Sequence, residues 1–178
     1  PKDDYKCLIF DDTDIAKRGK KIEGVSKVFD HVDHRLIFGF KLLVAGYWNG
    51  SVFIPVDFSF HRENKDNKGK KYGLSKKQRK QQKKTKRDSK LPVAKRFKEL
   101  NLKKTDMVVA MFKRVNKRKI EVDYILLDTW FTTMSLINKL SRINNEVHVI
   151  GMYKYNSKLS IEGKARSIKQ LRKHTGKM

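Results

Sequence analysis

Tyr5-Lys6-Cys7-Leu8-Ile9-Phe10-Asp11-Asp12 combines a short apolar run with two carboxylates at its end. An apolar run of this length is typical of a buried β-strand, which we place at Tyr5–Phe10. The carboxylates of Asp11 and Asp12 come directly after this strand, at a position where side chains can reach solvent or a metal ion. We expect this strand to lie at the centre of a sheet, because the later crossover connection can return beside it.

Two further strands are predicted after residues 17–33, a polar and glycine-containing stretch that we expect to be a loop. Leu36–Trp48 is almost continuously apolar, which is typical of a strand buried on both faces. Asn49-Gly50 then predicts a tight type I′ hairpin, because both residues tolerate positive φ angles. The returning strand, Ser51–Phe60, contains Pro55 and is therefore expected at an edge of the sheet.

The alternation along Ser51–Phe60 separates its side chains into two faces. Ile54, Val56, Phe58 and Phe60 lie on one face, and Asp57 and Ser59 lie on the other. Because Asp57 points away from the apolar side, we expect it to form a salt bridge with a neighbouring lysine.

The second half of the chain predicts an alternation of helices and strands. Apolar residues recur at helical spacing from Val93 to Leu100, from Met107 to Val115 behind Thr105-Asp106, and over Thr132–Arg142. Strands are predicted at Val122–Leu127 and Val147–Tyr153. The fold class is therefore α/β, with a five-stranded mixed sheet and flanking helices. A right-handed crossover would place Asp12 and Asp128 at the same ends of neighbouring parallel strands.

The chain is strongly basic, with 43 Lys and Arg residues against 19 Asp and Glu and a formal net charge of +24. Repulsion within a charge this large destabilises a compact fold unless a polyanion neutralises it, so we expect a nucleic-acid partner. Thirteen of the basic residues lie in Asn64–Lys90, which lacks apolar residues at helical spacing. We expect one domain over residues 1–178, with 64–90 as a flexible basic insertion that faces DNA. The residues expected to contact DNA are Lys17, Arg18, Lys20, Lys21, Lys70, Lys71, Lys76, Lys77, Arg79, Lys80, Lys83, Lys84 and Arg87.

Several classes of protein and site are excluded or disfavoured by the composition. Cys7 is the only cysteine, so the chain cannot build a disulfide framework or a thiolate metal site. The five histidines show no ligand spacing for zinc. No apolar run is long enough to span a membrane, and the start Pro1-Lys2-Asp3-Asp4 lacks the apolar region expected of a signal peptide. We therefore expect a cytoplasmic, DNA-associated protein.

The two aspartates at the strand ends are the candidate catalytic residues. Carboxylates that converge at the ends of adjacent strands suit Mg²⁺, which prefers oxygen ligands and often shares them with substrate phosphates. Such metals support phosphodiester chemistry when they are paired. An aspartate just after a strand is also a common turn or capping residue, so both interpretations of Asp12 and Asp128 stay open at this point.

Three stretches carry a family resemblance: Asp11–Lys21, Phe38–Phe60 and Tyr124–Phe131. Together they resemble the catalytic core of cut-and-paste insertion-sequence transposases. The resemblance implies an RNase H-like sheet and an Asp, Asp, Glu triad that holds two divalent metal ions, Mg²⁺ or Mn²⁺. The first aspartate of the triad falls on Asp12, directly before a threonine, and the second falls on Asp128.

The third member of the triad has no match, because Glu162 lies in an unrelated Ser-Ile-Glu-Gly context. We expect the glutamate beyond Met178, so this chain would be an incomplete and inactive fragment. The resemblance implies strand cleavage and strand transfer at transposon ends, with transposon and target DNA as partners and a homodimer on paired ends. Trp130 could stack on an unpaired base, with Phe131 a weaker candidate. Two alternatives stay open: a non-catalytic DNA-binding module and a nuclease that only hydrolyses.

Overall fold

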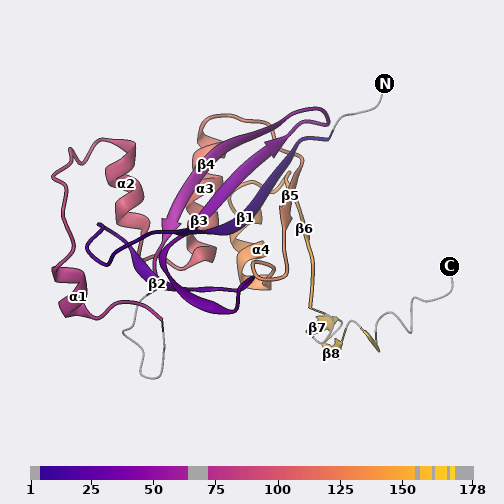
Figure 1. The fold of residues 1–178 in the computed structure, drawn as a ribbon. Coiled ribbons are helices and arrows are strands. Elements are labelled where there is room, and N and C mark those ends of the chain that lie inside the picture. Colours follow the sequence, from indigo (N-terminus) through magenta and orange to yellow (C-terminus); the bar gives the residue numbers. More distant parts are fainter. Residues whose placement is uncertain (1–4, 64–71, 155–156, 162, 168, 171–178) are drawn as a thin grey trace.

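The computed structural model of the chain describes residues 5–63, 72–154, 157–161, 163–167 and 169–170. A mixed sheet forms its centre, and helices pack against it (Figure 1). The strands of this sheet are β1 (Cys7–Ala16), β2 (Ser26–Asp30), β3 (Arg35–Trp48), β4 (Phe53–His61), β5 (Tyr124–Leu127) and β6 (His148–Gly151). The helices are α1 (Lys76–Lys80), α2 (Pro92–Glu99), α3 (Lys104–Lys117) and α4 (Met134–Ser141). A separate hairpin pairs β7 (Lys158–Ile161) with β8 (Lys164–Ser167).

Strand β1 is central, as expected. It pairs antiparallel with β3 and parallel with β5, and β5 pairs parallel with β6. Strand β4 pairs with the far side of β3. The strands predicted from the sequence therefore lie in the order β4-β3-β1-β5-β6, which is consistent with an RNase H-like fold and confirms the predicted class.

The main core lies between the sheet and two helices. Helix α3 contributes Met107, Met111 and Phe112, which pack against Leu8 and Phe10 of β1. Helix α4 adds Leu136 and Leu140 to the same cluster. Helix α3 begins near the point where β1 and β5 separate, so this packing positions its first turn beside the predicted acidic site.

Two boundaries near the chain start differ from the prediction. Strand β1 does not end at Phe10 but continues to Ala16, because β3 pairs with it along the whole distance. The loop predicted over residues 17–33 is wrong for Ser26–Asp30, which form β2 and pair with Arg35–Gly39. That strand was missed because it is short and shows no clear alternation. Val28 is nevertheless fully buried.

The connection between β3 and β4 is a hairpin, but not the two-residue type I′ turn. Gly50 has a φ of 93°, whereas Asn49 has no positive φ. The Asn49 side chain instead accepts hydrogen bonds from the backbone N–H groups of Ser51 and Val52, at 3.1 and 2.8 Å. A type I′ turn requires positive φ angles at both central residues, and here only Gly50 has one. Hydrogen bonds to the Asn49 carboxamide close a longer loop instead.

Residues 72–90, the described part of the basic segment, contain helix α1. The helix begins with a capping box, in which Ser75 accepts from the Gln78 N–H and the Gln78 side chain accepts from the Ser75 N–H. The prediction of a loop is therefore wrong for Lys76–Lys80, because capping and not apolar spacing defines this short helix. Residues 64–71, with Lys70 and Lys71, lie outside the described residues.

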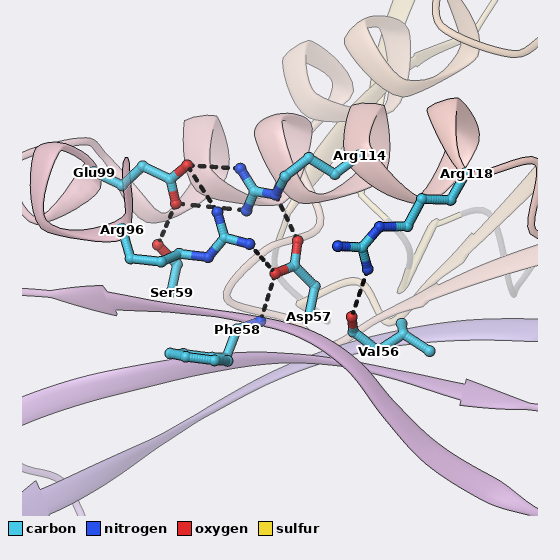
Figure 2. Close-up of polar contacts among 8 residues, drawn as sticks. All are labelled: Val56, Asp57, Phe58, Ser59, Arg96, Glu99, Arg114 and Arg118. Carbon is cyan, nitrogen blue, oxygen red and sulfur yellow. Dashed lines mark hydrogen bonds and ion pairs between the residues drawn. The ribbon is translucent and has the colours of Figure 1, made fainter. Parts of the chain in front are cut away.

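Asp57 forms a buried ion-pair cluster, but its partners are arginines and not the predicted lysine (Figure 2). Its carboxylate accepts from Arg96 at 2.5 Å and from Arg114 at 2.6 Å. Glu99 accepts from Arg114 at 2.6 Å and completes the cluster. Helices α2 and α3 cover the face of β4 that carries Asp57 and leave Phe58, on the other face, 47% exposed. The polar face of the edge strand is therefore the buried one.

Candidate active site

A pocket of about 520 Å³, which we call the acidic pocket, lies where β1 and β5 separate. Strand pairing ends at Phe10 and Leu127, so the residues after them diverge and leave space between the strands. The lining residues are Asp11, Asp12, Thr13, Asp14, Asp30, His31, Val32, Asp33, Lys41, Lys104, Thr105, Asp128, Trp130 and Phe131. The fold thus brings Asp12 and Asp128, 116 positions apart in the sequence, to one pocket.

Asp12 is held on the side of β1 that faces helix α3. Its carboxylate accepts a hydrogen bond from Lys104 Nζ at 2.5 Å, and its side chain is 16% exposed. Lys104 is the first residue of α3. The pair therefore links the central strand to the start of the helix that packs over it. Sequence reasoning missed Lys104, because nothing in its local context distinguishes it from the many other lysines.

Asp128 follows β5 directly and shapes the next turn. Its Oδ1 accepts the backbone N–H groups of Trp130 and Phe131, at 2.9 and 3.1 Å. This arrangement is the turn-capping role that an aspartate after a strand often plays. Oδ2 has no hydrogen-bond partner among the described residues, so one oxygen can hold the turn while the other is available to a ligand.

A second ion pair borders the same pocket. Lys41 of β3 is 5% exposed and donates to Asp14 of β1 at 2.9 Å. The sequence analysis did not single out either residue for a role in the site. Their strand positions are paired in the β1–β3 register, Asp14 opposite Lys41, so an opposite-charge cross-strand pair was the available signal.

His61 lies near these pairs, opposite Lys41 in the β3–β4 register. Burial lowers the pKa of His61 below its usual value, and the neighbouring Lys104 acts in the same direction. Glu63 and the carboxylate of Asp12 oppose that shift. The ring is therefore neutral at pH 7 and adds no positive charge beside the pocket.

Comparison with known protein families identifies the family of this chain. A family model described as DDE superfamily endonuclease matches residues 1–176. The chain belongs to the DDE superfamily endonucleases. The match confirms the resemblance to transposase catalytic cores and implies a nucleic-acid substrate. Searches of curated proteins and of solved structures found no match.

DDE enzymes generally use divalent metal ions, so the donor set of this endonuclease is informative. Asp12 and Asp128 offer hard carboxylate oxygens, which fit Mg²⁺, and Mg²⁺ usually completes its coordination with water and substrate phosphates. Within the described residues, no group of three or more His, Cys, Asp or Glu side chains is arranged to hold a metal ion. Glu162 lies outside those residues. The two aspartates therefore have chemistry that suits a divalent metal ion.

The basic residues predicted to contact DNA fall into two places on this endonuclease. Lys17, Arg18, Lys20 and Lys21 are exposed in the connection between β1 and β2 and do not line the acidic pocket. Lys76, Arg79, Lys80, Lys83 and Lys84 line a separate groove. Lys77 is exposed, and Arg87 pairs with Glu23. Of the predicted basic residues that the structure describes, none lines the acidic pocket.

The two aromatic candidates have different environments. Phe131 is 1% exposed and belongs to the core, which is the structural role for such a ring. Trp130 is 66% exposed at the edge of the acidic pocket. Its ring lies 5.6 Å from the His31 ring and 4.4 Å from Lys154 Nζ. Base stacking by Trp130 stays a prediction that its exposure allows.

The contact between Lys104 and Asp12 makes a prediction about metal affinity. Replacing Lys104 with Met removes a cation that competes with a divalent ion for the Asp12 carboxylate. We expect Mg²⁺ to bind roughly fivefold more tightly, since a partly exposed ion pair contributes up to about 1 kcal/mol. Isothermal titration calorimetry measures this affinity. Lys103→Met, which changes the exposed neighbour, is the matched control, and unchanged or weaker binding in the Lys104 variant would contradict the prediction.

One general property concerns the membrane. Among the helices of the described residues, none combines the length and the apolar character needed to cross a bilayer.

Proposed function

We propose that this chain is the catalytic core of a DNA transposase, with Asp12 and Asp128 as ligands of divalent metal ions. The observation that carries the proposal is the convergence of these two carboxylates on one pocket between neighbouring parallel strands. The family match supports the same class of chemistry. In open α/β sheets, ligands bind beyond the carboxyl ends of the strands, which is where Asp128 lies.

The proposed reaction has two steps. Hydrolysis at a transposon end breaks one phosphodiester bond and leaves a 3′ hydroxyl. That hydroxyl then attacks a phosphodiester of the target DNA, forms a new bond to its phosphorus and releases the target strand's own 3′ hydroxyl. Divalent ions held by Asp12 and Asp128 would supply stabilisation of charge on the phosphate oxygens during both displacements.

Other side chains at the pocket have roles in this proposal. Lys104 lies beside Asp12 and can neutralise a substrate phosphate once a metal ion occupies the carboxylate. Asp14 and Lys41 balance one another and keep the floor of the pocket polar without adding net charge. Trp130, which is 66% exposed at the edge of the pocket, is the candidate for stacking on a base separated from its pair.

The test is metal-dependent cleavage of a duplex that carries the ends of the element from which the chain derives. The full-length protein that contains this chain is incubated with labelled DNA in Mg²⁺, Mn²⁺ or EDTA, and products are separated on a denaturing gel. We expect nicks and joined strands with Mg²⁺ or Mn²⁺ and none with EDTA. Nicks without joined strands would identify a nuclease that only hydrolyses.

A binding module without catalysis is the second candidate function. The net charge of +24 and the two-carboxylate donor set within the described residues favour it. Such a module would bind DNA with a steep dependence on salt and with no dependence on divalent metal, because phosphate neutralisation releases counterions whether or not chemistry follows. DNA binding with no cleavage under any metal condition would therefore replace the transposase proposal with this one.

A further inference from the structure

A second cavity, of about 690 Å³, opens beside helices α1 and α2 and is distinct from the acidic pocket. The two cavities share no lining residue. Seven of its lining residues are basic and one, Glu23, is acidic. We call this cavity the basic groove. Its apolar lining includes Phe97 and Leu100 from the end of α2.

The basic groove exists because the chain after α1 is attached to the connection between β1 and β2. Gln82 is buried and donates to the backbone carbonyls of Val25 and Lys20, at 2.7 and 3.2 Å. The Lys83 N–H donates to the Lys21 carbonyl at 2.8 Å. The buried Gln82 side chain therefore fixes one wall of the groove against the connection between β1 and β2.

An ion pair between Arg87 and Glu23 also holds the chain after α1 to the connection between β1 and β2. Arg87 donates to both Glu23 oxygens, at 2.9 and 2.6 Å, and its guanidinium lies 4.1 Å from the centre of the Phe97 ring. Hydrogen bonding to Arg87 is the main reason that the pKa of Glu23 falls below its usual range. The acidic residue of the groove is therefore neutralised by a partner outside its lining.

Several lysines of the groove are left without acidic partners. Lys76, Lys80, Lys83, Lys84 and Lys98 are exposed, and none of them forms an ion pair within the described part of the chain. Clustered lysines repel one another, and this repulsion costs folding stability unless an anion is bound. The charge and shape of the groove thus favour a ligand with closely spaced negative charges and an apolar part.

We propose that the basic groove binds the sugar–phosphate backbone of DNA at a position separate from the catalytic carboxylates. Lysines on the wall contact successive phosphates, and the partly exposed Phe97 side chain lies against the deoxyribose between them. Phosphate contacts of this kind position a duplex without reading its sequence. The inference rests on the proposed function for the identity of the nucleic acid, and it adds Lys98 and the groove in which these lysines meet Phe97.

The test measures how DNA affinity depends on salt. Binding of the 178-residue chain to a fluorescein-labelled duplex of about 25 bp is followed by anisotropy over a range of KCl concentrations. Lys83→Gln/Lys84→Gln removes two groove lysines, and the matched control Lys113→Gln/Lys117→Gln removes two exposed lysines from the outward side of α3. We expect the slope of log affinity against log salt to fall by about 1.8 in the groove variant, which is about 0.9 for each phosphate that a lysine no longer neutralises. The control slope should change by much less.

Equal changes in the two variants would overturn the proposal, because the groove would then contribute no more than general surface charge. An unchanged slope in the groove variant would overturn it as well. If these binding results overturn the groove proposal while metal-dependent cleavage is intact, the transposase proposal still stands. The two proposals can therefore be overturned independently.

Discussion

Replacing Asp12 with Asn is expected to reduce metal-dependent strand cleavage by about a thousandfold. Bound divalent ions stabilise the charge that develops on phosphate oxygens by several kcal/mol. Each 1.36 kcal/mol or so corresponds to a factor of about ten in rate, which gives this magnitude. Asn keeps the shape of the side chain but loses its charge. Single-turnover cleavage of labelled transposon-end DNA measures the effect.

Asp128→Asn should reduce cleavage by a similar factor with little change in folding stability. The carboxamide oxygen can still accept the N–H groups of Trp130 and Phe131, so the turn after β5 is retained. Asp128→Ala removes both the acceptor and the charge, and should lose stability as well. A capping role alone predicts a different pattern, in which the Asn variant is active and only the Ala variant is impaired.

Asp11→Asn is the control for both substitutions. Asp11 precedes Asp12, is exposed and accepts the N–H of Asp12 at 2.8 Å, which Asn can also do. Its cleavage rate should stay within a few fold of wild type. If Asp12→Asn and Asp128→Asn cleave as well as the Asp11 control, the assignment of metal ligands is wrong.

Replacing Asp57 with Asn is expected to lower the free energy of unfolding by about 3–5 kcal/mol. Removal of one member of a buried ion-pair network leaves the others uncompensated, and this is the usual cost. The Asp57 side chain is 4% exposed and contacts two arginines, so an unpaired positive charge would stay between β4, α2 and α3. Urea denaturation followed by tryptophan fluorescence measures the change.

The control is Asp33→Asn, which removes an exposed partner of Arg35. Its side chain is 51% exposed, so the loss should stay below about 1 kcal/mol. Arg96→Met in the Asp57→Asn background tests the mechanism further, because Glu99 alone then faces one arginine and no positive charge is left uncompensated. We expect the double variant to recover part of the stability that Asp57→Asn loses. A loss below about 1 kcal/mol in Asp57→Asn alone would show that the cluster is not a stabilising network.

The order of the predicted strands and the position of Asp128 directly after β5 were predictable from local patterns, whereas Asp12 lies within β1 and not at its end. Leu36–Trp48 is apolar over most of its length, and Tyr124–Leu127 is followed at once by Asp128. Such patterns depend on neighbours in the sequence, which is the information that periodicity carries. The placement of β5 beside β1 followed from the handedness of crossover connections and is confirmed.

Contacts between distant residues were not predictable in this way. Asp57 was expected to meet a lysine, and its arginine partners lie 39 and 57 positions away. Lys104 reaches Asp12 across 92 positions, and Gln82 reaches Val25 across 57. In a chain with 43 Lys and Arg residues, composition alone cannot choose which cation meets which carboxylate.

By itself, the sequence determined the class of fold, the central strand, the excess of positive charge and the two aspartates that precede threonines. Only the tertiary structure decided that Asp12 and Asp128 share a pocket with Lys104, and that part of the basic segment forms one wall of a separate groove. The physical reason is the range of the interactions. Burial patterns and turn preferences act between near neighbours, whereas ion pairs and grooves depend on which surfaces the packed helices and strands bring together.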